Sequence, residues 1–100
     1  MIDLEHLKRL VGNDETVIAK LLAHLRTELP RLINELELQL DAGAFQAASI
    51  TAHTLKTQLS YIGATDAAHW AAQLERETEE NKVAAFSLLQ LKAFVGQVEI

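Results

Sequence analysis

The sequence contains no cysteine, a single proline and four glycines among its 100 residues. Without cysteine, the chain can form neither disulfides nor thiolate metal sites. Aromatic residues make up only 5% of the chain, and valine and isoleucine are also sparse, so strand-forming residues are few. Leucine and alanine dominate instead, and both favour helices. The composition therefore predicts an all-α fold.

Long apolar runs are also absent. No stretch of eighteen apolar residues is present, so we expect no transmembrane helix. The N-terminus lacks the basic start and apolar block of a secretory signal. A net charge of −5 argues against a nucleic-acid partner, which would require a basic face. We therefore expect one cytoplasmic, monomeric domain over residues 1–100, with no membrane insertion.

Apolar spacing and capping residues predict five helical segments. The first, short segment runs from about Asp3, its expected N-cap, to Val11, and Gly12 closes it. Asn13 is the expected N-cap of a long second segment, and Pro30 inside it predicts a kink rather than a break. Apolar residues follow each other at steps of three and four in this second segment: Val17, Leu21, Leu25, Leu29, Leu32, Leu36 and Leu40.

Three further segments follow after short turns. The third is expected over about residues 44–62, with Gly63 as its terminating residue. The fourth opens at Thr65 or Asp66 and ends in a polar turn over residues 79–82. Its apolar side carries Ala67, Ala71, Leu74 and Thr78, and the fifth segment carries Val83, Phe86, Leu89 and Ala93, followed by Phe94, Val95 and Val98.

Long amphipathic helices joined by short turns predict an antiparallel up-down four-helix bundle, with the short N-terminal helix capping one end. The stripes converge on one expected core. It comprises Leu25, Leu29, Leu32, Leu55, Leu59, Leu74 and Phe86.

One face of the third segment carries polar residues that suit chemistry on an anion. Ser49, His53, Lys56, Thr57 and Ser60 fall within roughly 100° of one another around a helix. The core stripe lies elsewhere, so the His53 ring is expected to flank the core with one nitrogen facing water. A neutral imidazole nitrogen is a good nucleophile, and Lys56 can supply positive charge to an anion beside it. Hydroxyl donors are available from Thr57 and Ser60.

The same segment resembles the phosphoacceptor helix of histidine-containing phosphotransfer (HPt) domains, which are intermediates of two-component phosphorelays. That family's helix reads roughly His-x-Leu-Lys-Gly, then five residues, then Gly-Ala or Gly-Leu. His53, Leu55, Lys56, Gly63 and Ala64 stand at the matching positions, and Thr57 replaces the first glycine.

The resemblance implies the helical-bundle fold and a function. It implies that His53 accepts a phosphoryl group from the aspartate of a response-regulator receiver domain and passes it to another receiver. Lys56 would stabilise that group, with Ser49, Thr57 and Ser60 in support. The receiver would supply the Mg²⁺, so no cofactor is expected on this chain, and a hybrid sensor histidine kinase is a further possible partner.

Other chemistries find little support in the sequence. No Glu-x-x-His or His-x-x-x-His pair suggests a metal site, and no glycine-rich loop suggests ATP binding, so the chain would be a carrier rather than a kinase. His6, His24 and His69 are interpreted as surface residues. The acidic residues Glu75, Glu77, Glu79 and Glu80 are interpreted as a solvated helix face. Two alternatives remain open: a degenerate HPt-like module that binds a receiver without turnover, and a plain helical scaffold domain.

Overall fold

The computed structural model describes residues 2–82 and 85–98, which form helices and turns without any strand. The helices are α1 (Leu4–Val11), α2 (Glu15–Asp41), α3 (Phe45–Tyr61), α4 (Thr65–Glu79) and α5 (Ala85–Gln97). The all-α prediction is therefore confirmed. None of these helices is long and apolar enough to cross a membrane.

The first two helices begin at aspartate caps. Asp3 accepts a hydrogen bond from the backbone N–H of His6 at 3.1 Å. Asp14, rather than the expected Asn13, caps α2, because its Oδ1 accepts from the N–H groups of Thr16 and Val17. Asparagine and aspartate are equally good caps, so the sequence alone does not distinguish two neighbouring candidates.

Helix α2 continues without interruption through Pro30, as a single helix over 27 residues. The prediction of one helix rather than two is confirmed, and a bend at Pro30 stays a prediction. The start of the apolar stripe is corrected, because Val17 is 45% exposed while Ile18 is buried. Both residues are β-branched and apolar, so their order in the sequence did not identify the inward-facing one.

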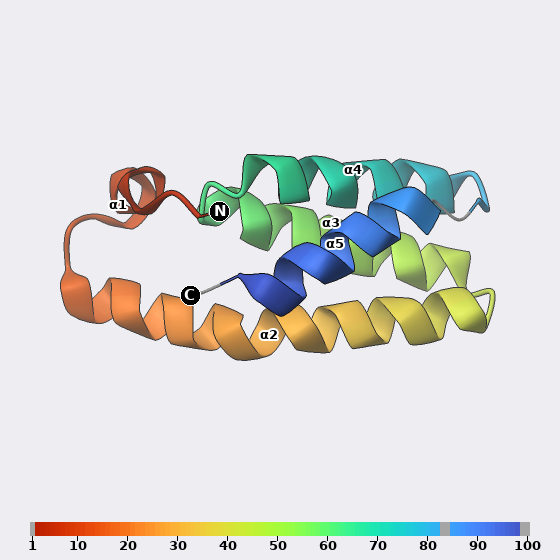
Figure 1. The fold of residues 1–100 in the computed structure, drawn as a ribbon, viewed down its shortest axis with the longest axis horizontal. Coiled ribbons are helices and arrows are strands. Elements are labelled where there is room, and N and C mark those ends of the chain that lie inside the picture. Colours follow the sequence, from red (N-terminus) through yellow and green to blue (C-terminus); the bar gives the residue numbers. More distant parts are fainter. Residues whose placement is uncertain (1, 83–84, 99–100) are drawn as a thin grey trace.

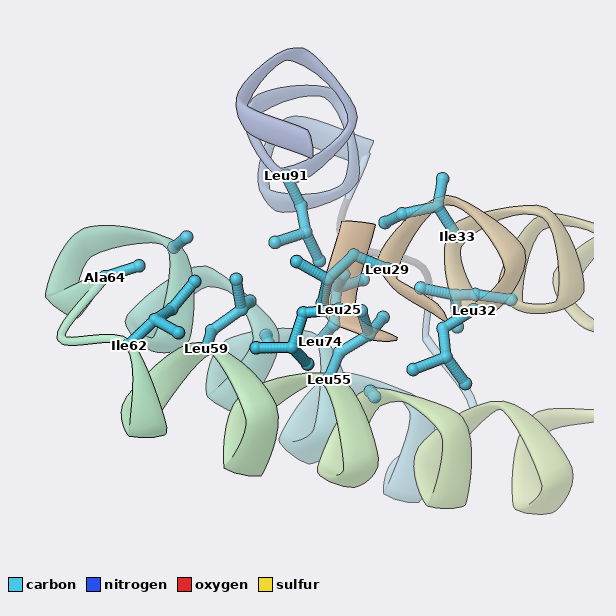
Figure 2. Packing of buried hydrophobic residues seen from close by; sticks show 14 of the residues in the cluster. Leu25, Leu29, Leu32, Ile33, Leu55, Leu59, Ile62, Ala64, Leu74 and Leu91 are labelled. Carbon is cyan, nitrogen blue, oxygen red and sulfur yellow. The ribbon is translucent and has the colours of Figure 1, made fainter. Parts of the chain in front are cut away.

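The long helices form one bundle. Helix α2 packs against α3 and α5, and α4 packs against α3 and α5, so each of the four long helices packs against two of the other three. Figure 1 shows α2 on one long side, α3 and α4 on the other, and α5 crossing between them. Leucines from all four helices meet at the centre of this bundle (Figure 2). They include Leu25, Leu29, Leu55, Leu59, Leu74 and Leu91.

The expected core is confirmed except on α5. Phe86 is 69% exposed, and Leu91 is fully buried in its place. The helix is apolar on nearly all sides, so its spacing did not define an inward face. Val83, expected on the same face, lies outside the described residues.

Helix α1 lies against the turn between α3 and α4 (Figure 1), where the N–H of Asp3 donates to the carbonyl of Ile62 at 2.7 Å. Gly63 in this turn has a φ of 69°, the left-handed conformation that favours glycine. A Cβ at Gly63 would also lie 2.5 Å from the Cβ of Asp3. Gly63 therefore ends α3, as predicted, and its lack of a side chain leaves room for Asp3 and α1 to pack against the turn.

Candidate functional site

The His53 side chain lies on the outer face of α3 and is 56% exposed. Its neighbours on the helix, Ala52 and Leu55, are fully buried. His53 therefore flanks the core, as expected from the helical geometry, and its ring reaches solvent.

A glutamate from the next helix holds the ring. Glu75 on α4 lies with its Oε2 2.9 Å from Nδ1 of His53. Its other oxygen, Oε1, accepts a hydrogen bond from Nζ of Lys56, also at 2.9 Å. One carboxylate thus joins the histidine and the lysine, which stand one turn apart on α3. The glutamate side chain is only 19% exposed and that of Lys56 is 34% exposed, so the cluster is partly shielded from water.

This contact corrects the interpretation of Glu75 as part of a solvated face. Glu75 follows the buried Leu74 and faces α3, whereas Glu79 and Glu80 are exposed. The sequence contains a signal for the contact between Glu75 and His53. His53 is ten residues before Gly63 and Glu75 is twelve after it. Helices joined by a tight turn bring residues at similar distances from that turn together.

The electrostatics of the cluster keep Glu75 ionised. Burial raises the pKa of the Glu75 carboxyl, but hydrogen bonds from Lys56 and His53 and their positive charge outweigh that effect, so its pKa is lowered from the usual 4.5. A lowered pKa means that the carboxylate stabilises the fold at neutral pH. That contribution is lost only as the pH falls through the lowered pKa.

The ionised carboxylate selects a tautomer of His53. A carboxylate only accepts hydrogen bonds, so the nitrogen facing it must carry the proton. With the proton on Nδ1, the lone pair lies on Nε2 of a ring that is more than half exposed. The arrangement therefore presents a nucleophilic nitrogen to solvent and an anion to the opposite side of the ring.

The three hydroxyls expected to support the site are turned toward their own helix. Ser49 donates to the carbonyl of Gln46, Thr57 to that of His53, and Ser60 to that of Lys56, at 2.9, 3.1 and 2.8 Å. Each hydroxyl would have to break this bond before it donated to a phosphoryl oxygen.

The remaining histidines are not brought to this cluster. His24 and His69 are exposed and His6 is half-buried on α1. Within residues 2–82 and 85–98, no group of three or more histidine and carboxylate side chains is placed to hold a metal ion.

The fold and the site define an all-helical bundle that exposes one braced histidine on the outer face of a central helix. Residues 20–99 match the family model of the Hpt domain. The chain therefore belongs to the Hpt family, whose domains serve histidine phosphotransfer in two-component systems and interact with response-regulator receiver domains. Comparisons with curated proteins and with solved structures gave no match.

Proposed function

We propose that the chain is a phosphorelay intermediate in which Nε2 of His53 accepts a phosphoryl group from a receiver-domain aspartate and passes it to a second receiver. The observation that carries this proposal is the bond between Glu75 and Nδ1 of His53. It leaves Nε2 as the nucleophile on an exposed ring.

The transfer conserves charge and atoms without a base on this chain. The Nε2 lone pair forms a bond to phosphorus while the bond between phosphorus and the aspartyl oxygen breaks, and the aspartate leaves as a carboxylate. The imidazole becomes a positively charged phosphoimidazole with its proton still on Nδ1. Glu75 lies 2.9 Å from that nitrogen and stabilises the new charge, as carboxylates do beside catalytic histidines.

Lys56 would act in two ways. Its ammonium holds Glu75 with one of three possible donors and remains one helical turn from His53. The same cation would offset charge on the transferring phosphoryl group, which needs in-line positioning and positive charge more than covalent help.

The face around His53 suits a protein partner. Ile50 and Tyr61, also on α3, are 63% and 47% exposed. Both lie within about 80° of His53 around the helix. Exposed apolar side chains beside a reactive group favour docking of another protein. In this proposal the receiver brings the aspartate and the Mg²⁺, and a hybrid sensor kinase is one upstream source of phosphate.

The proposal includes the remaining expectations of the sequence: a monomeric, cytoplasmic domain with the long helices in an antiparallel up-down order. It also includes α1 in the same domain, although α1 precedes the matched segment. The fully buried Leu7 and the bond from Asp3 to Ile62 support that assignment.

Incubation with a panel of phosphorylated receiver domains tests the function. We expect acid-labile phosphate to appear on this chain with at least one receiver and to move on to a second, unphosphorylated receiver. If no receiver transfers acid-labile phosphate to this chain but one forms a stable complex with it in a binding assay, the chain is instead a degenerate docking module. Thr57, whose β-branch stands beside His53 where the family has glycine, is the residue that favours this alternative. The absence of both transfer and binding would indicate a plain scaffold.

A further inference from the structure

A groove lies at the end of the bundle, where α1 and the turn before α4 meet the C-terminal part of α5. Its volume is about 790 Å³. The apolar part of its lining consists of Ile2, Leu4, Ala64, Ala67, Trp70 and Phe94.

The apolar lining is fixed in place by the core. Ala64 and Ala67 are buried, and Trp70 and Phe94 are half-buried and pack against the core cluster. Leu4 remains 44% exposed at the edge. The groove therefore offers a preformed apolar surface, and burying such a surface is favourable.

The rim of the groove is acidic. Asp3, Glu5 and Asp66 line it, and no lysine, arginine or histidine is among the lining residues that the structure describes. The N-termini of α1 and α4 contribute about half a positive charge each, which leaves an excess of about two negative charges. Lys8 meets Glu5 at 3.6 Å, but both side chains are exposed and the pair contributes little.

From this combination of chemistry, we infer that the groove binds a short segment of a partner protein in which a bulky apolar side chain is flanked by lysine or arginine. The apolar side chain fills the space over Trp70 and Phe94, and the cations meet the acidic rim. The net charge of −5 and the same rim disfavour an anionic membrane or a nucleic acid as the occupant.

This groove is separate from the proposed phosphotransfer site. Gly63, at its edge, is ten residues from His53, or about 15 Å along the helix. Residues 2–5, which form one wall, precede the segment that matches the family model. A partner held here would leave the His53 face free, so one protein could be anchored while phosphotransfer proceeds.

The single tryptophan of the chain makes a direct test possible. Because Trp70 lines the groove, its emission should change when the groove is occupied. We would titrate the protein with three peptides free of tryptophan and tyrosine: phenylalanine flanked by arginines, the same peptide with serine for phenylalanine, and the same peptide with glutamates for arginines. A saturable change in Trp70 emission is expected only with the first.

Matched variants locate the binding. The double change Glu5→Gln and Asp66→Asn should raise the dissociation constant of the first peptide by roughly fivefold, because two exposed charge pairs are lost. The control Glu79→Gln with Glu80→Gln alters the net charge equally at exposed positions outside the groove and should have no effect on peptide binding. Binding by the His53→Gln variant should be unchanged, which keeps this result independent of phosphotransfer.

Equal binding of all three peptides, binding of none, or equal weakening in the control variant would overturn the inference. A Trp70 signal that changes with protein concentration in the absence of peptide, together with a dimeric mass, would also overturn it by making a second copy the occupant.

Discussion

Three side chains carry the proposed chemistry of this molecule at the scale of single residues. His53 and Lys56 were identifiable in the sequence because they stand one turn apart beside an apolar stripe. Glu75 was missed, because a glutamate in an acidic run is usually solvated and both of its partners lie on another helix. The position of a residue around its own helix follows from 3.6-residue periodicity, whereas a contact between helices also depends on their register.

Glu75→Gln tests the positioning of the ring. The amide is neutral and can either donate or accept, so it no longer fixes the proton on Nδ1. We expect phosphotransfer to slow by about tenfold or more, in line with the loss of other groups that orient a histidine. Nitrogen-15 chemical shifts should show the Nδ1–H tautomer in the wild type and a mixture in the variant.

Glu77→Gln is the matched control, since Glu77 lies on the same helix and its Oε1 meets Gln73 rather than the histidine. Transfer at the wild-type rate by Glu75→Gln, with an unchanged tautomer, would refute the positioning role.

Lys56→Ala separates rate from stability. The lysine is about one-third exposed, so removing it should cost only about 0.5 to 1 kcal/mol of unfolding free energy, including its pair with Glu75. Loss of its charge beside a transferring phosphoryl group should cost about 1–3 kcal/mol in the activation barrier. Stopped-flow transfer and chemical denaturation measure the two quantities, and a large loss of stability with unchanged transfer would reverse the assignment.

At the scale of helices and turns, the α3–α4 connection positions the site. The sequence predicted Gly63 as the end of α3, and the structure adds that Asp3 of the N-terminal segment packs directly on it. No local pattern reveals that second role, because it depends on a contact between residues sixty positions apart.

Gly63→Ala and Gly43→Ala form a matched pair. Both glycines have φ near 70°, but a Cβ at Gly43 would meet nothing within 4 Å, whereas one at Gly63 would meet Asp3 at 2.5 Å. Gly43→Ala should cost about 1–2 kcal/mol for the left-handed conformation alone. Gly63→Ala should cost clearly more, because α1 must also shift. Equal costs in urea denaturation would mean that α1 does not pack on the turn as described.

At the scale of the whole molecule, the bundle was predictable and the orientation of its last helix was not. Six of the seven expected core residues are buried, because the stripes of α2, α3 and α4 alternate with polar positions. Helix α5 lacks this contrast, so its spacing predicts Phe86 in the core, whereas Leu91 is the buried residue.

Leu91→Ala against Leu89→Ala tests the orientation of α5. Leu91 is fully buried, so the change to alanine should lower the unfolding free energy by about 2–5 kcal/mol. Leu89 is 63% exposed on the same helix and should cost less than about 1 kcal/mol. The reverse order of the two costs would place the opposite face of α5 in the core.

The proposed role of His53 depends on the whole bundle. The bundle positions α4 so that Glu75 binds Nδ1 of His53 and leaves Nε2 free. The most direct measurement is the location of the phosphate after reaction with a phosphorylated receiver, by nuclear magnetic resonance of the phosphorylated protein. The account predicts phosphate on Nε2 of His53 and none on a folded His53→Gln variant. Phosphate on Nδ1, on His6, His24 or His69, or on the His53→Gln variant would contradict it.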